Sequence, residues 1–442
     1  MCIVRTVTLD RLLYKAPGRG AILAGKSSAV KPHTRYTPHE ALALVLDAVD
    51  PLPSETVALE HAHGRVLSEP LAACLDDPRF DKAAVDGYGL RTDEPEANVA
   101  GKEFTVVADL AAGDGATVAL APGEAVRIMT GARVPAGVGQ VIKVENCELA
   151  GSTAKLIVPE RITNIAFQGE NIRAGDPLLS PRRLRAQDIG VLASQGYAEV
   201  PVTRRPRVAV ISTGNEVVAP GEPLPEAGIH DSNGYQLSGL AREAGAEVTR
   251  PGIVQDDPRA LHEEIARAAA SHDVVILSGG VSMGELDYVP RVVSDLGASI
   301  IFHGLAVKPG RPTLYAVLDG APPVARTRIF GLPGNPVSTI VQFELLIRPL
   351  LDALLGETPA SRAPGEARPG EARLPLAEAY TRRNADRYEY LPGVVRDGEV
   401  VRLRYEGSGH ISVLADAEIF FRIDAGVDRL DAGSEVDVRF IR

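Results

Sequence analysis

The stretch that most constrains the fold runs from Asp273 to Tyr288 and reads DVVILSGGVSMGELDY. It starts with a short, continuous apolar run, Val274 to Leu277, which is typical of a strand buried on both faces of a parallel sheet. Glycines and serines follow, and a helical pattern is predicted from about Glu285 to Gly297. A strand that leads through a glycine loop into a helix directs backbone N–H groups toward an anion, although ordinary α/β turns share this pattern.

The polar side chains of this loop favour a ligand site over an ordinary turn. Ser282, Glu285 and Asp287 follow the predicted strand, at the carboxyl edge of the sheet, where α/β folds bind their ligands. A divalent cation such as Mg²⁺ takes oxygen ligands from a few carboxylates together with phosphate groups. The loop therefore predicts a site for a phosphorylated ligand and a bridging cation.

Strands and helices alternate on both sides of this stretch. Between Pro206 and Leu355, apolar runs alternate with helical patterns, which predicts a mostly parallel sheet with helices on both faces. The last of these helices is predicted to start at Asn335 and to run to Leu355. A chain of 442 residues is too long for one core, so this three-layer unit is one of about two to four domains, and the fold class is multidomain α/β.

The segments around the α/β unit predict smaller domains. Thr37 and Glu40 form a capping box at the start of a helix, and short β runs lie between Phe104 and Val158. A further helix contains Leu184, Ile189 and Leu192 and ends at Gly196, and we expect it to pack against the Thr37 helix as one discontinuous domain. The predicted units are an N-terminal extension (1–36), a discontinuous scaffold domain (37–70 and 165–202), an inserted small β domain (71–164), the α/β domain (203–357), a linker (358–373) and a C-terminal β domain (374–442).

Composition excludes several classes of partner. The formal charge of −11 argues against nucleic acid or an anionic membrane, and no apolar run approaches the length of a transmembrane helix. The three cysteines lack metal spacing and indicate a reducing compartment, which predicts a cytoplasmic location. Residues 1–36 carry a basic bias, which fits a transit peptide, a disordered extension or an over-long start.

Four loops of the α/β unit follow or join predicted strands: STGNE, SGGVSMGELD, KPGRP and LPGNP. They carry Glu216, Asp287, Lys308 and Arg311, a set of carboxylates and cations that suits a nucleotidyl or phosphorylated ligand with Mg²⁺. The chain has neither the GxxxxGK[ST] nor the GxGxxG spacing, which weakens the case for ATP hydrolysis or nicotinamide chemistry. Asp86 and Thr130 lie outside this unit, and each by itself fits an ordinary turn.

These motifs, together with DGYG, RIMTGA and HDSN, resemble those of the MoeA-type molybdopterin molybdenumtransferases, which are related to the E domain of gephyrin. The resemblance covers the chain from about Thr37 to its C-terminus. It implies a homodimer that inserts molybdate into adenylylated molybdopterin with Mg²⁺ and releases AMP. It also implies a cleft between the α/β domain of one subunit and the inserted β domain of the other, which carries Asp86 and Thr130.

The resemblance also assigns residue roles. It implies catalytic roles for Asp287, Glu216, Asp86 and Asp256, of which Asp287 and Glu216 would also bind the metal. It implies that substrate is bound by Thr130, Ser278, Gly279, Gly280, Ser282, Lys308, Arg311, Pro333, Pro336 and Ser408. Molybdopterin adenylyltransferase and apo-molybdoenzymes are the implied protein partners.

Three alternatives stay open. The same fold serves as an anchoring scaffold in gephyrin, tungstate is nearly isosteric with molybdate, and a pterin adenylyltransferase or nucleotide pyrophosphatase shares the α/β domain. The additional β domains and the VSMGELD loop argue against the last of these. The chain departs from the family at Lys82 and Ala83, in a shortened segment after Ile172, and at Pro392, where the family often has an Arg.

Overall fold

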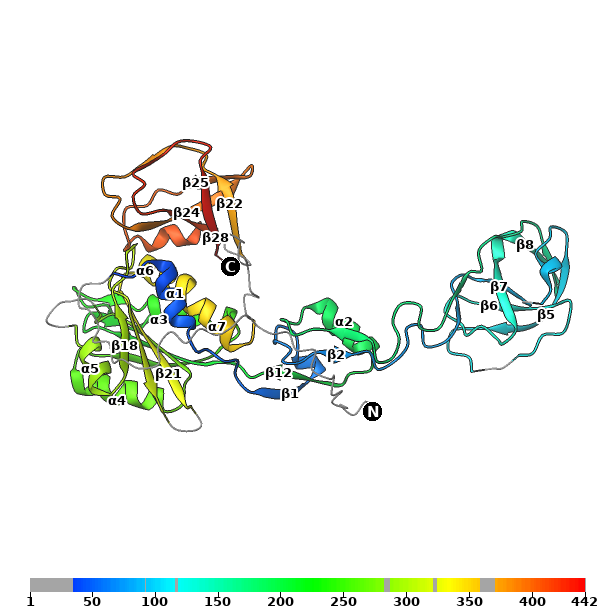
Figure 1. The fold of residues 1–442 in the computed structure, drawn as a ribbon, viewed down its shortest axis with the longest axis horizontal. Helices are drawn as coiled ribbons and strands as arrows, with labels where there is room; N and C mark the ends of the chain where they lie inside the picture. The colour runs from blue at the N-terminus through cyan, green and yellow to red at the C-terminus, as the bar shows by residue number, and fades with distance from the viewer. Residues whose placement is uncertain are drawn as a thin grey trace, which may run out of the picture.

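The computed structural model describes residues 35–91, 93–115, 118–281, 287–320, 324–357 and 370–441. Figure 1 shows an elongated molecule, with the α/β and C-terminal domains at one end and the inserted β domain at the other. The segment that contains β1 (Ser54–Ala58), α2 (Ala186–Ser194) and β12 (Glu199–Thr203) lies between them. Within the described part of the chain, no helix has the length and apolar content needed to cross a bilayer.

The central sheet of the α/β domain is mostly parallel, as predicted. Its strand order is β16 (Glu247–Val254), β13 (Arg207–Thr213), β17 (Val274–Ser278), β21 (Arg326–Leu332), β20 (Leu314–Asp319) and β18 (Ser299–His303). The first four strands are parallel to one another, and β20 is antiparallel to both of its neighbours. The carboxyl ends of β13, β17 and β21 therefore lie together at one edge.

Two hydrophobic cores cover the two faces of this sheet. Alternate residues of β17 point to opposite faces, so that Ile276 joins one core and Leu277 the other. The first core contains residues of α1 (Pro38–Leu46), α3 (Asn233–Glu243), α6 (Pro336–Gln342) and α7 (Arg348–Leu354). The second contains residues of α4 (Pro258–Ala269) and α5 (Val289–Asp295). The expected burial of β17 on both faces is thus confirmed.

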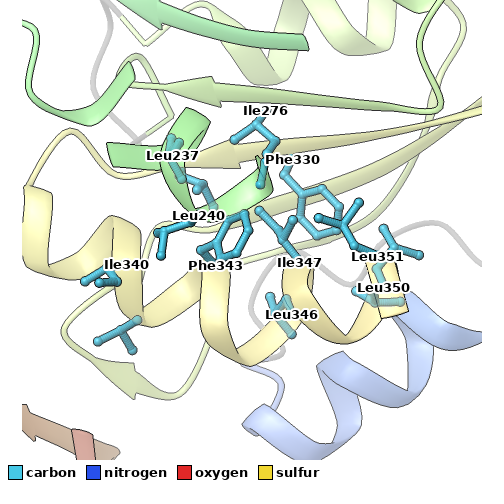
Figure 2. Close-up of a cluster of buried hydrophobic side chains, with 14 of the residues drawn as sticks. Leu237, Leu240, Ile276, Phe330, Ile340, Phe343, Leu346, Ile347, Leu350 and Leu351 are labelled. Atoms are coloured by element: carbon cyan, nitrogen blue, oxygen red, sulfur yellow. The ribbon is translucent and has the colours of Figure 1, made fainter. Parts of the chain in front are cut away.

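The long helix after β21 contains one wide turn. A π-helical turn, η4 (Phe343–Ile347), connects α6 to α7 within the predicted helix. Figure 2 shows Phe343 and Ile347 packed near Leu240 and Phe330, while Leu346 lies on the side of the neighbouring helix α1. The helix thus buries one face against the sheet and another against α1.

The N-terminal helix packs differently from our expectation. The capping box of α1 is confirmed, because the Glu40 backbone N–H donates to the Thr37 hydroxyl at 3.3 Å. The predicted packing of this helix against the Ala186–Ser194 helix is wrong, since Leu42 and Val45 lie in the core of the α/β domain. Helix α2 packs in a separate core with β12. Order along the chain does not determine which of several apolar faces covers a helix.

Two-stranded sheets lie both between the domains and within them. They pair β1 with β12, β2 (Leu71–Ala72) with β11 (Pro177–Leu179), β3 (Lys82–Ala83) with β10 (Ile165–Ala166), β14 (Val217–Val218) with β15 (Ile229–His230), and β23 (Tyr380–Thr381) with β27 (Arg429–Leu430). The first of these pairs joins two segments that lie more than a hundred residues apart in the sequence.

The inserted β domain contains a single six-stranded sheet. Its order is β7 (Val138–Lys143), β4 (Gly87–Arg91), β6 (Glu124–Ile128), β5 (Glu103–Leu110), β9 (Thr153–Leu156) and β8 (Cys147–Ala150). Asp86 directly precedes β4, and Thr130 follows β6, which is the neighbouring strand. The sheet register therefore brings these two residues together.

The C-terminal sheet takes one strand from the α/β domain. Its order is β19 (Val307–Lys308), β24 (Tyr388–Arg396), β26 (Ile419–Ile423), β28 (Glu435–Phe440) and β22 (Glu371–Pro375), with β25 (Glu399–Arg402) also paired to β24. Strand β19 belongs to the KPGRP loop and runs parallel to β24. Strand β22 begins at Glu371, inside the segment predicted as a linker, because it pairs with β28.

Candidate functional site

A cavity of about 590 Å³ lies at the carboxyl ends of β13, β17 and β21. It is bordered by Ser212–Gly214, Glu216, Val217, Ile229–Asn233, Asp256, Ser278–Gly280, Asp287 and Gly334–Pro336 from the α/β domain, and by Gly409 and Ile411 from the C-terminal domain. Three of the four predicted loops thus meet at one cavity.

The glycines of the SGG loop allow these loops to approach one another closely. Gly279 and Gly280 have φ angles of 101° and 64°, a conformation that L side chains rarely adopt. A Cβ atom on Gly279 would lie 2.6 Å from the Thr213 carbonyl oxygen. The Gly279 N–H donates to the Leu332 carbonyl at 3.0 Å, so backbone contacts connect the ends of three strands.

Two buried polar residues connect these loops, and we did not predict them as site residues. Asp231 accepts hydrogen bonds from the Ser212 hydroxyl at 2.9 Å and from the Gly234 N–H at 2.8 Å. Asn233 donates to the Ser278 hydroxyl at 2.8 Å and to the Gly334 carbonyl at 2.7 Å. The HDSN sequence was the available signal, but capping of the following helix explained it equally well.

Four carboxylates of the described residues border the cavity: Asp231, whose hydrogen bonds are given above, and Glu216, Asp256 and Asp287. Burial raises the pKa of Asp256, and the charges of Glu216 and Asp287 raise it further, against a hydrogen bond from the Asn215 backbone. Among the described residues, no group of three or more His, Cys, Asp or Glu side chains is placed to bind a metal ion. Glu216, Asp256 and Asp287 are too few to surround a metal ion by themselves. Such a set suits a cation that takes its other oxygen ligands from the substrate.

The KPGRP loop does not border this cavity, and the expectation that all four loops share it is wrong for this loop. The Lys308 ammonium lies 2.7 Å from Glu389 of the C-terminal domain. Arg311 is exposed on the same loop. The loop joins β18 to β20 at the same sheet edge, but its pairing with β24 draws it toward the C-terminal domain.

The LPGNP turn lies where the α/β and C-terminal domains meet. Pro336 borders the cavity and is the first residue of α6, and the Pro333 carbonyl accepts a hydrogen bond from the Thr339 hydroxyl at 3.0 Å. The Ser408 carbonyl accepts from the Val337 N–H at 3.2 Å. Ser282 and Glu285, the other polar residues singled out on the glycine loop, lie outside the described residues.

Asp86 and Thr130 form a hydrogen-bonded unit far from the cavity. Asp86 accepts from both the backbone N–H and the hydroxyl of Thr130, each at 2.7 Å, and these bonds lower the pKa of Asp86. The unit belongs to the inserted β domain at the opposite end of the molecule (Figure 1). Within one chain, the structure therefore does not bring Asp86 and Thr130 to the other predicted residues.

Known proteins match this arrangement along almost the whole chain. Three family models match: the MoeA N-terminal region (domain I and II) over residues 36–196, a probable molybdopterin binding domain over 209–353, and the MoeA C-terminal region (domain IV) over 373–441. The molybdopterin molybdenumtransferase of Staphylococcus aureus (strain COL) is 32% identical over 406 residues, which cover 90% of this chain and 94% of that protein. The corresponding protein of Nostoc sp. is 36% identical over 339 residues, 74% of this chain and 77% of its own.

Solved structures agree with these matches. Two crystal structures of a molybdopterin biosynthesis MoeA protein from Pyrococcus horikoshii superpose with TM-scores of 0.79 and 0.76, at 31% and 28% identity. Each comparison covers 92% of this chain and 100% of the other. The similarity thus extends over all the domains and is not restricted to the α/β unit.

The substitution Gly279→Ala is expected to destabilise the protein by about 1–3 kcal/mol, because Ala disfavours this φ angle and its Cβ would collide with Thr213. Urea unfolding followed by circular dichroism measures the effect. Gly239→Ala, in the middle of α3 where a Cβ meets no atom within 4 Å, is the matched control and should be neutral or stabilising. Equal tolerance of both substitutions would show that the loops do not need their close approach.

The substitution Asp256→Asn is expected to raise the melting temperature near neutral pH. Because the pKa of Asp256 is raised in the folded state, the folded protein binds more protons than the unfolded chain between the ordinary and the raised pKa. The stability of the wild type should therefore fall as pH rises through this window, whereas the variant should not show this loss. Below the window, the two proteins should be equally stable.

Thermal unfolding from pH 4 to pH 8 without divalent cations measures this difference. Glu263→Gln, on the exposed side of α4, removes the same charge outside the cavity and is the control. A lower stability of Asp256→Asn near neutral pH would contradict the cost that burial and the charges of Glu216 and Asp287 impose on the Asp256 carboxylate.

Proposed function

The chain belongs to the MoeA family of molybdopterin molybdenumtransferases, transferases of molybdenum cofactor biosynthesis, and from this we propose that it inserts molybdate into adenylylated molybdopterin. The proposed reaction depends on Mg²⁺, releases AMP and takes place in the cytoplasm. The observation that carries the proposal is the cavity in which Glu216, Asp256 and Asp287 lie beside glycine loops at the carboxyl ends of parallel strands.

In this proposal, the glycine loop binds the phosphate groups of the substrate. Ser278, Gly279 and Gly280 border the cavity, and the absence of side chains on the two glycines lets a phosphate approach the backbone. Asp287 and Glu216 would hold Mg²⁺, which would supply positive charge beside the phosphate groups of the substrate. Burial and the charges of Glu216 and Asp287 raise the pKa of Asp256, and we assign it the role of exchanging a proton during the reaction.

Lys308 and Arg311 would bind molybdate beside this cavity. Both belong to the loop between β18 and β20, and both are exposed. His303, at the end of β18, lies within hydrogen-bonding distance of the Val281 carbonyl at 2.7 Å, which connects this loop to the glycine loop. A tetrahedral dianion requires such basic donors, and the same chemistry would accept tungstate.

We infer that a second copy of the chain completes the site. Asp86 and Thr130 form a preorganised unit, and their distance from the cavity within one chain leaves them available to another subunit. A homodimer with twofold symmetry would contain two such composite sites.

Asp287→Ala is expected to abolish AMP release and leave the fold intact, because the residue borders the cavity at the end of the glycine loop. The assay combines the protein with adenylylated molybdopterin, Mg²⁺ and molybdate and measures AMP by chromatography. Asp295→Ala, which removes an exposed carboxylate of α5, is the matched control and should keep full activity. A fully active Asp287→Ala variant would refute the assignment, and substrate binding by the wild type without turnover would favour a gephyrin-type scaffold.

A mixing experiment tests the composite site. Asp86→Ala and Asp287→Ala should each be inactive alone, but random exchange of subunits should form heterodimers with one intact site. If half of the dimers are mixed and each has one of two sites, activity should return to about a quarter of the wild-type value. Mixtures that stay inactive, although mass spectrometry shows that the subunits have exchanged, would place both residues in the site of one chain.

A further inference from the structure

A buried ion-pair cluster lies where the KPGRP loop meets the C-terminal domain. Its centre is Glu389, which is only 2% exposed. One carboxylate oxygen lies 2.7 Å from the Lys308 ammonium. The other accepts a hydrogen bond from the Tyr380 hydroxyl at 3.2 Å and lies 3.4 Å from the Arg382 guanidinium. The carboxylate thus has partners on both oxygens.

Arg382 has a structural role in this cluster. It is 8% exposed, and its guanidinium donates to the carbonyl groups of Val427, Arg387 and Asp424 at 2.6–2.9 Å. Burial and the Glu389 charge raise the pKa of Tyr380 to about 12, so the phenol stays a neutral donor at physiological pH. Two cations and one carboxylate give the cluster a net charge of +1.

Lys308 is the accessible member of the cluster. Its side chain is 53% exposed. Its ammonium group has three N–H donors, and a hydrogen bond to Glu389 uses fewer than three of them. Its backbone is held by the pairing of β19 with β24, and the Gln342 amide donates to the carbonyl of the next residue, Pro309, at 3.2 Å. The structure thus presents a positioned ammonium group to solvent, with a buried carboxylate behind it.

We propose that Glu389 is a positioning residue that sets the strength of oxyanion binding at Lys308. It holds the ammonium group in place and cancels part of its charge, so a tetrahedral dianion binds weakly enough to be passed on to the dithiolene. This inference rests on the proposed function, in which Lys308 binds molybdate. Tight binding of a substrate in the ground state does not raise the rate of a transferase. Weaker molybdate binding at Lys308 is therefore compatible with efficient transfer.

Glu389→Gln separates the two effects of the carboxylate. The Gln side chain has nearly the same shape, and its amide oxygen can still accept from Lys308, so Lys308 keeps its acceptor while the negative charge is lost. The amide NH2 replaces the oxygen that faces Tyr380 and Arg382, so an unchanged circular dichroism spectrum is required of this variant. We expect the Kd for molybdate, measured by titration calorimetry on the full-length protein, to fall about fivefold or more because a repulsive charge near the dianion is removed. In turnover assays, KM for molybdate and kcat should both fall. Lys308→Met should raise the Kd about tenfold or more.

The controls distinguish this inference from the proposed function. Glu418→Gln removes the same charge from an exposed ion pair of the same domain and should leave the Kd unchanged. If Glu389→Gln binds molybdate no more tightly than the wild type while Lys308→Met loses binding, the inference is overturned and the proposed function stands. If Lys308→Met binds like the wild type, Lys308 is not an oxyanion ligand, and the assignment beneath the inference fails.

A second variant covers the case in which Glu389→Gln does not fold. Glu389→Asp keeps the charge but withdraws it from Lys308 by one methylene group, so binding should tighten by a smaller factor, about twofold. Weaker binding by this variant, with an unchanged circular dichroism spectrum, would show that Glu389 only holds the loop in place and would overturn the inference.

Discussion

The close approach of three strand ends is the constraint on which the rest of the site depends. The backbone of the SGG loop lies so near Thr213 that a Cβ atom on Gly279 would be 2.6 Å from a carbonyl oxygen. Glycine has no Cβ atom, so it permits this close contact and adopts a positive φ angle at low energetic cost. The approach places the ends of β13, β17 and β21 around one cavity, so groups from distant parts of the chain face the same volume.

Buried polar contacts hold these loops in register. Asp231 connects the end of β13 to the start of α3, and Asn233 connects the same helix to the loops after β17 and β21. Such bonds stabilise a buried arrangement mainly because an unpaired polar group there would be costly. Burial raises the pKa of Asp256, and the nearby charges of Glu216 and Asp287 raise it further. The fold thus maintains a local concentration of negative charge that a cation would relieve.

The C-terminal domain is coupled to this site through the loops of the α/β domain. Strand β19 adds to its sheet, Ser408 accepts a hydrogen bond from the start of α6, and Ile411 borders the cavity. The inserted β domain lies at the far end of the molecule (Figure 1). Within one chain, the predicted residues of the α/β domain therefore lie around or near the cavity, whereas Asp86 and Thr130 lie far from it.

The sequence alone determined the local elements and the family. The capping box of α1 and the doubly buried strand β17 follow from residue spacing, because these features depend on neighbours in the chain. The mostly parallel sheet was predicted from the alternation of strands and helices, because short connections allow few topologies. Of the residues that the motifs singled out, Glu216, Ser278 to Gly280, Asp287 and Pro336 border the cavity. Only the tertiary structure decided that α1 packs on α7, that the KPGRP loop pairs with β24, and that Asp231 and Asn233 border the cavity. These outcomes depend on contacts between segments that lie far apart in the sequence. The spacing of residues along the chain does not specify which distant segment will pack against a given helix or loop.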